Sequence, residues 1–202
     1  AEAYRNLGEN QKGLETLRAA SLAVAGSAAI QLALGESSDQ AGYPAEALPA
    51  FRKAFELDPE SHVTALRLAQ TLFSLGHLSE AQSVLINAMK CWPENPDLAY
   101  IYANTSLAIG DREAALQALE IAILTDQPEI KRYILLAETL LEAYRPGSTG
   151  EIDRKPYHLD RANQVLETAL TWMPDHTMGL ILYGEVLLAR GEIQEAFEIF
   201  SQ

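Results

Sequence analysis

The feature that most constrains this chain is a repeat with a period of about 34 residues. Glycine recurs at this spacing, at Gly8, Gly42, Gly76 and Gly110. Three more columns of small or large apolar residues keep the same register: Gly13, Ala47, Ala81 and Ala115; Leu17, Phe51, Leu85 and Leu119; and Ala20, Ala54, Ala88 and Ala122. Because independent columns share one period, the chain is an array of one supersecondary unit, whose copies must stack to bury their apolar faces.

The residue types in these columns predict a unit of two helices. Gly42 and Gly76 each follow a helical pattern, at a place where a left-handed helix cap requires a residue without Cβ. Pro59 and Pro93 stand past a second helix that they cannot continue, and Pro128 follows one residue late. We therefore predict an all-α chain with about eleven helices, at two helices per unit.

This pattern resembles the tetratricopeptide repeat, whose units carry an aromatic-x-x-Leu-Gly-x-x-Tyr opening, an Ala-x-x-x-Phe segment and a proline. Leu34-Gly35, Ala47 to Phe51 and Pro59 match it in one unit, while the opening slot is aromatic only at Tyr133. A glycine such as Gly35 allows two helices to approach closely. The resemblance covers the whole chain and implies a right-handed α-α superhelix, a solenoid of tandem helical hairpins.

The register assigns the chain to a single array over residues 1–202. Its units are expected at 1–27 (partial), 28–61, 62–95, 96–129, 130–176 and 177–202 (partial). Since the chain begins and ends within a unit, we expect a fragment of a longer protein. Uncovered apolar stacking faces at its two ends would favour end-to-end self-association.

One complete unit interrupts the period. Its slots at Ala137 and Ala162 lie roughly twice as far apart as the equivalent Ala103 and Ala115 of the unit before it. Proline and glycine among the extra residues predict an inserted loop over about 145–157. Its candidate binding residues are Arg145, Arg154, Lys155 and Tyr157. Two interpretations remain open: a partner-specific element, or a neutral expansion whose closure costs only about 1 kcal/mol.

The charge balance limits the kinds of partner. With 15 Lys and Arg against 28 Asp and Glu, the net charge of the 202 residues is −13. Nucleic acids and anionic membrane surfaces both require clustered cations, so neither is an expected partner. The sequence has no uninterrupted apolar run of about 18 residues, so membrane insertion is not expected either.

The residue types that could carry chemistry occur in patterns that predict no catalytic site, cofactor or metal. No phosphate-binding Gly-x-x-x-x-Gly-Lys motif occurs, and the four histidines show no metal-ligand spacing, so surface or capping roles are expected for them. Cys91 is the single cysteine, which excludes an intramolecular disulfide, and we expect it half-buried near a helix end. This cysteine usage fits a reducing compartment, so a cytoplasmic location is expected, with the periplasm left open.

The resemblance also implies a binding face, because first helices of successive units line a concave groove in this family. The candidate residues by family position are Leu66, Gln70, Phe73, Tyr100, Asn104, Leu107, Lys131, Ile134 and Glu138. The same slots hold Met178, Ile181, Glu185 and Leu188 in the last unit. Apolar residues at helical spacing are also what a core face contains, so a purely structural role is the alternative.

These residues lead to a functional hypothesis. The chain is expected to be a non-catalytic scaffold that binds a protein or peptide segment in its groove. Acidic side chains at Glu36, Asp39, Glu138 and Glu185 would favour a partner that is apolar and basic. The alternative is a regulatory or substrate-docking arm of a larger enzyme or signalling protein. The basic clamp with which one branch of the family holds acidic chaperone tails is not assembled, because Leu32, Leu66, Tyr100 and Ile134 occupy its lysine slot.

Overall fold

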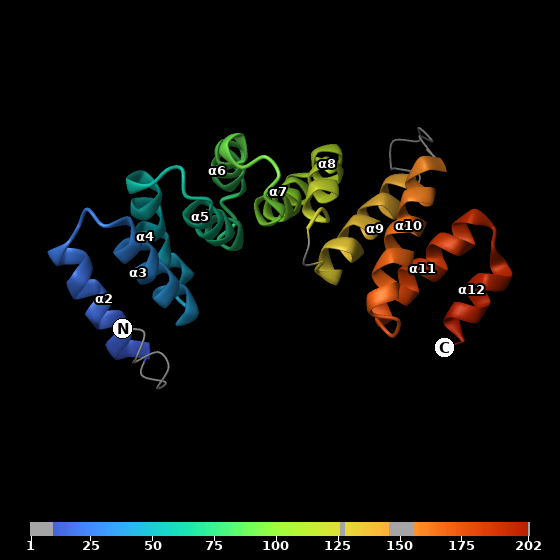
Figure 1. The fold of residues 1–202 in the computed structure, drawn as a ribbon, viewed down its shortest axis with the longest axis horizontal. Helices are drawn as coiled ribbons and strands as arrows, with labels where there is room; N and C mark the ends of the chain where they lie inside the picture. Colours follow the sequence, from blue (N-terminus) through green and yellow to red (C-terminus); the bar gives the residue numbers. More distant parts are fainter. Residues whose placement is uncertain (1–9, 126–127, 146–155, 202) are drawn as a thin grey trace. The chain divides into compact units, whose positions relative to one another are not determined.

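The computed structural model describes residues 10–125, 128–145 and 156–201, which contain eleven α-helices and no strand (Figure 1). The predicted all-α fold is therefore confirmed. The helices are α2 (Asn10–Ala23), α3 (Ala28–Gln40), α4 (Pro44–Leu57), α5 (His62–Ser74), α6 (Leu78–Cys91), α7 (Pro96–Ile109), α8 (Arg112–Ala122), α9 (Ile130–Tyr144), α10 (Pro156–Trp172), α11 (Thr177–Arg190) and α12 (Ile193–Phe200).

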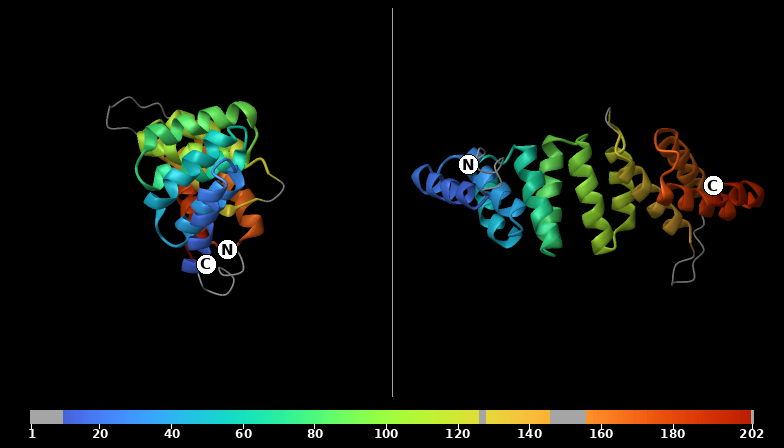
Figure 2. Two further views of the ribbon diagram at one scale, coloured as in Figure 1. Left: turned by 90° about the vertical axis from the view of Figure 1, so that its left-hand side faces the viewer. Right: turned by 90° about the horizontal axis from the view of Figure 1, so that it is seen from below.

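The chain divides into two compact parts, each larger than one repeat. We call them unit 1 (Ala1–Ile109) and unit 2 (Gly110–Gln202). In unit 1, α3 pairs with α4 and α5 with α6, and each second helix also packs on the next first helix. Unit 2 repeats this pattern, with α9 against α10 and α11 against α12. The first helices α5 and α7 touch within unit 1, as do α9 and α11 within unit 2, so each unit is a short stack of helical hairpins (Figure 2).

A glycine in the left-handed conformation stands in the turns that join α3 to α4, α5 to α6 and α11 to α12. Gly76 has a φ of 78°, and its equivalent Gly42 has a φ of 84°, as their column predicted. At this turn the Gly76 N–H donates to the Phe73 carbonyl at 3.0 Å, and the His77 N–H donates to the Leu72 carbonyl at 2.8 Å. The helix therefore stops at a backbone conformation that a side chain disfavours.

Replacing Gly76 by alanine is expected to lower the free energy of unfolding by about 1 kcal/mol or more, because alanine is strained at this positive φ. Gly26 is the matched control. It lies in a turn without a positive φ, and a Cβ added there would meet no atom within 4 Å. Urea denaturation followed by circular dichroism should show the loss at Gly76 only; a similar loss in both variants would contradict the turn assignment.

Close approach of the two helices of a hairpin is confirmed at Gly35. A Cβ on this residue would lie 2.5 Å from Cε1 of Phe51, whose side chain is fully buried. Gly184 and Phe200 repeat the arrangement in α11 and α12. The phenylalanine ring of the second helix thus occupies the space that a side chain at the glycine of the first helix would fill.

A column of buried hydroxyl groups runs through the first helices. Thr71, Thr105 and Thr139 are each one repeat period apart, and each Oγ1 donates to the carbonyl of the residue four positions earlier in its helix, at 2.7–2.9 Å. These three side chains are almost completely buried. The internal hydrogen bond therefore allows the threonine hydroxyl to be buried without being left unsatisfied.

Unit 2 contains a buried arginine at a position where the preceding repeat has leucine. Arg132 is 3% exposed, and its equivalent in unit 1 is the core residue Leu98. Its Nη1 donates to the carbonyl of Ala122 at 3.1 Å, at the C-terminal end of α8, and Nη2 pairs with Glu129 at 2.7 Å. The hydroxyl of Tyr133 donates to the carbonyl of Ile123 at 3.3 Å, and burial raises the pKa of this phenol. The end of α8 is thus capped by side chains of α9.

Candidate protein-binding face

Six of the predicted binding residues lie on the two touching first helices of unit 1. Helix α5 contributes Leu66, Gln70 and Phe73; helix α7 contributes the residues one repeat period later, Tyr100, Asn104 and Leu107. All six side chains are half-buried. We call these six residues the unit 1 face. The repeat register thus places an apolar or aromatic pair, an amide pair and a second apolar pair on adjacent helices.

Helix caps fix the two helices that carry the unit 1 face. Ser61 caps α5, with its Oγ accepting a hydrogen bond from the Thr64 N–H at 3.3 Å. At the start of α7, Oδ1 of Asn95 accepts from the Leu98 N–H at 3.0 Å, and Pro96 is the first helical residue. At both helix N-termini, a side-chain oxygen accepts a hydrogen bond from a backbone N–H of the first turn. The proline at the start of α7 has no N–H that would need a partner.

The amide side chains of the unit 1 face are held in place by neighbours. Asn104 donates from Nδ2 to the Tyr100 carbonyl at 2.8 Å. Gln70 accepts from Nη1 of Arg67 at 3.3 Å. Leu66 packs against the hydrophobic core of unit 1, so for this residue the structural alternative holds at least in part.

Arginine side chains pair with two of the acidic residues that were predicted to attract a basic partner. Arg67 Nε lies 3.1 Å from Oε1 of Glu36, which links α5 to α3. In unit 2, Arg145 Nη2 lies 2.7 Å from Oε2 of Glu185. The charge that was expected to attract cations is therefore partly compensated within the chain itself.

The remaining predicted groove residues lie on α9 in unit 2. Lys131 and Glu138 are exposed, and Lys131 forms an ion pair with Glu129 at 2.6 Å. This ammonium group, together with Arg132, holds the pKa of the Glu129 carboxyl below its ordinary value. Ile134 is half-buried and reaches toward Gly179 of α11, where an added Cβ would lie 3.4 Å from its Cδ1.

The C-terminal end of the predicted loop, at Pro156 and Tyr157, is helical. Helix α9 ends at Tyr144 and α10 begins at Pro156, so Tyr157 belongs to the first turn of a helix, where it is exposed. Proline favours the first position of a helix, which explains the earlier start. Of the other predicted loop residues, Arg145 is described and pairs with Glu185, whereas Arg154 and Lys155 lie outside the described residues.

The histidine and cysteine predictions have mixed outcomes. His176 caps α11, with Nδ1 accepting from the Gly179 N–H at 3.0 Å, as a capping role predicts. His62 lies against the indole of Trp92, with ring centroids 5.0 Å apart. The prediction for Cys91 is wrong in its burial, because this last residue of α6 is exposed. A residue at the very end of a helix lies beyond the part that the neighbouring helix covers.

The described part of the chain has neither a cluster of metal ligands nor a helix that could span a membrane. No group of three or more His, Cys, Asp or Glu side chains there is arranged to hold a metal ion. Among the helices of the same residues, none is both long and apolar enough to cross a bilayer.

Stacked hairpins, glycine turns and close helix contacts define a helical-repeat protein of the α-solenoid class. Family models described as tetratricopeptide repeat match residues 40–90 and residues 66–129. Residues 40–129 are therefore tetratricopeptide repeats, as the sequence pattern indicated.

Solved structures support the same fold. The chain is similar to PilF of Pseudomonas aeruginosa, with a TM-score of 0.75, 17% identity and coverage of 96% of this chain and 82% of that one. It is also similar to YrrB, described as a TPR protein with an unusual peptide-binding site, with a TM-score of 0.74, 16% identity and coverage of 93% and 90%. A third similar structure is MamA from Desulfovibrio magneticus RS-1, with a TM-score of 0.69, 16% identity and coverage of 84% and 91%.

A curated relative is the BBSome complex member BBS4 homolog of Drosophila melanogaster. It is 28% identical over 156 residues, which cover 76% of this chain and 31% of the relative. The chain therefore spans less than a third of that protein's length.

Proposed function

We propose that this chain is a protein-interaction scaffold that binds a peptide or helical segment on the unit 1 face. The observation that carries the proposal is the alignment of Phe73 with Leu107 and of Leu66 with Tyr100 on touching helices. Half-buried aromatic and aliphatic side chains can gain further burial from a partner without prior rearrangement of the helices.

The chemistry of the unit 1 face favours an apolar partner with amide or hydroxyl groups. Along each helix, the amide residue, Gln70 or Asn104, stands between the two apolar residues of the unit 1 face. These amides can orient a polar backbone or side-chain group of the partner. Two names among the similar proteins agree with this assignment: YrrB is described as peptide-binding, and the BBS4 homolog as a member of a complex. The alternative, a docking arm of a larger enzyme or signalling protein, uses the same face and differs only in what the rest of such a protein does.

Replacing Phe73 or Tyr100 by alanine is expected to weaken binding by about 1–3 kcal/mol each, because truncating an aromatic anchor removes its buried contact area. The probe is a displayed library of random 15-residue peptides selected on the wild-type chain, and affinities of selected peptides are then measured by calorimetry.

Ile86→Ala is the matched control for this experiment. Ile86 is a large apolar residue of α6 that is 43% exposed, but it belongs to a second helix outside the unit 1 face. It should leave affinity unchanged. If selected peptides bind the Phe73→Ala and Tyr100→Ala variants as tightly as wild type, with helix content intact, the unit 1 face is not the binding site.

A further inference from the structure

A tryptophan joins two consecutive turns of unit 1. Trp92 follows α6 directly, and its indole Nε1 donates to the Glu60 carbonyl at 2.9 Å. This bond connects the turn between α6 and α7 to the turn between α4 and α5. The indole also lies against the imidazole of His62, with ring centroids 5.0 Å apart. The two turns, residues 57–62 and 91–97, thus lie side by side, and we call them the turn surface.

The turn surface contains an apolar hollow around this tryptophan. Residues 91–96 line a hollow of about 410 Å³. Although two contacts hold its ring, Trp92 is 45% exposed, and Pro93 beside it is exposed as well. An indole that is already ordered loses little conformational entropy when a partner covers it, and tryptophan is enriched among the residues that dominate binding energy. The open part of the ring is therefore available to a ligand.

The charge of the turn surface has a single sign. Neither of its two segments contains a lysine or an arginine, whereas together they contain four carboxylates, at Asp58, Glu60, Glu94 and Asp97. All four of these residues are exposed. Among the ion pairs of the described residues, none includes Asp58, Glu60 or Glu94. Negative charge therefore surrounds the tryptophan without an internal counter-charge.

The basic residues of the surrounding helices are engaged with other partners. Helices α4 to α7 contain four of them, which pair as follows: Arg52 with Glu80, Lys53 with Glu56, Arg67 with Glu36, and Lys90 with the side-chain amide of Asn87. A cation that arrives from outside thus does not have to displace an internal one at the turn surface, and charge complementarity favours a basic occupant.

An exposed indole next to free carboxylates suits a guanidinium better than an ammonium group. A cation over the face of a tryptophan ring is attracted by the ring quadrupole. The planar guanidinium of arginine stacks on such a face and can also donate two parallel hydrogen bonds to a carboxylate, whereas the ammonium of lysine is a compact and strongly hydrated charge. Glu94 lines the same hollow as Trp92, and Glu60 is the residue whose carbonyl holds the indole.

We propose that the turn surface is a second docking site of unit 1, which takes an arginine-containing segment of a partner protein. The guanidinium stacks on Trp92 and pairs with the carboxylates of Glu60 and Glu94. The site lies at the turns and acts independently of the unit 1 face, which lies along α5 and α7. Because the backbone carbonyl of Glu60 accepts the indole hydrogen bond, the side chain of Glu60 is left for the partner.

The test is a selection of displayed random peptides on the full chain carrying Trp172→Phe, which leaves Trp92 as the only tryptophan. Peptides that bind the same chain with Trp92→Ala are removed first. We expect a class of peptides that share an arginine. Binding should change the Trp92 fluorescence, and the Kd should rise at least about threefold between low and high salt. Replacing the shared arginine of the peptide by lysine should weaken binding about threefold or more, because lysine lacks the planar fork.

Variants of the chain separate the turn surface from the unit 1 face. Trp92→Ala and the double variant Glu60→Gln/Glu94→Gln should each weaken this peptide class at least about fivefold. Phe73→Ala, in the unit 1 face, should leave it unchanged. Because Trp92 also links the two turns, the double variant, which alters only exposed side chains, guards against a loss of folding.

Glu15→Gln/Glu198→Gln is the matched control. It removes the same amount of charge from exposed residues outside the turn surface, and it should change the Kd less than about twofold.

Five outcomes would overturn the proposal. One is that no peptide class depends on Trp92. Another is that the dependent peptides carry no basic residue. A third is that Glu60→Gln/Glu94→Gln binds them as tightly as wild type does. A fourth is that their binding is lost in Phe73→Ala as well, which would leave the unit 1 face intact as a proposal but remove an independent second site. The last is that sedimentation shows a dimer that Trp92→Ala dissociates, which would make a second copy the occupant.

Discussion

Replacing Phe51 by alanine is expected to lower the free energy of unfolding by about 3–5 kcal/mol. The ring is fully buried, and it fills the space that Gly35 leaves open on the facing helix. Glycine has no side chain with which to fill the resulting cavity, so the neighbouring core residues lose contacts outright. Urea denaturation followed by far-UV circular dichroism measures the change.

Phe200 provides an internal control for this prediction. It packs on Gly184 in the same way, but it is 52% exposed, because nothing in the described structure covers its outer side. Phe200→Ala is therefore expected to lower the free energy of unfolding by only about 1–2 kcal/mol. Equal losses in the two variants would mean that stacking between hairpins adds nothing to the packing within each hairpin.

The second large effect is expected at Arg132. Changing Arg132 to alanine should lower the free energy of unfolding by about 2–4 kcal/mol, because the carbonyl at the end of α8 loses its buried donor and a cavity remains. Arg132→Leu should recover part of the loss, since leucine is the residue at the equivalent position of the preceding repeat, Leu98. Thermal and urea unfolding of the three proteins would measure both steps.

A surface arginine of the same unit is the comparison for Arg132. Arg112 forms an ion pair with Glu142 at 3.5 Å, with about half of each side chain exposed. Its replacement by alanine should change stability by less than about 0.5 kcal/mol. If Arg132→Ala is as mild as Arg112→Ala, the guanidinium does not cap α8 in solution.

The helical architecture was predictable because its determinants are local and repeated. Glycine at a left-handed turn, proline after a second helix and a small residue opposite a large one each recur once per repeat period, so each can be read from the sequence. Helices α3, α5 and α7 begin at Ala28, His62 and Pro96, which are the expected starts of units. The division into one tandem array stays a prediction.

Side-chain pairing was far less predictable. Arg132 looks like a surface cation in the sequence, and only its position one period after Leu98 indicated a core slot. The pairs of Glu36 with Arg67 and of Glu185 with Arg145 join residues 31 and 40 positions apart, which helix periodicity alone does not connect. The basic partner stays a prediction, and two of the four carboxylates on which it rests are paired within the chain.

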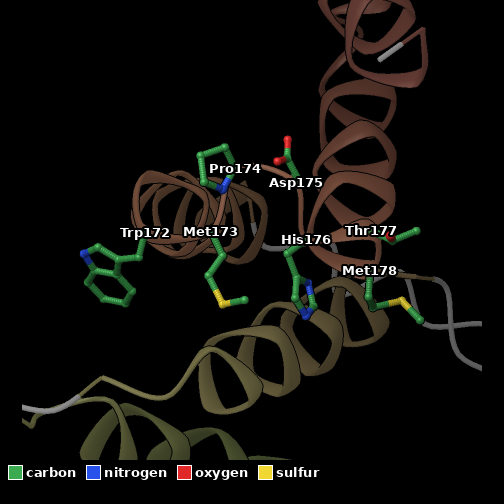
Figure 3. Close-up of a pocket in the computed structure, with 7 residues that line it drawn as sticks. All are labelled: Trp172, Met173, Pro174, Asp175, His176, Thr177 and Met178. Atoms are coloured by element: carbon green, nitrogen blue, oxygen red, sulfur yellow. The ribbon is translucent and has the colours of Figure 1, made fainter.

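The side chains around the turn from α10 to α11 were not predictable for a related reason. Met178 was identified as a slot on a first helix, whereas Trp172 and Met173 lie at the end of the preceding second helix, just before Pro174. They line one hollow with Met178 because the chain reverses direction over Pro174 and Asp175 (Figure 3).

The pattern of helix contacts also sets how the polypeptide acquires its structure. Within each unit, the main contacts of a described helix are with the next helix or with the one after it. Contacts between residues close in sequence require little loop closure before they form, and proteins with such low contact order fold on a scale of microseconds to milliseconds. Folding can therefore start at any single hairpin and spread to its neighbours. A destabilised hairpin would open by itself, so native-state hydrogen exchange of this chain should show separate protection levels rather than one global value.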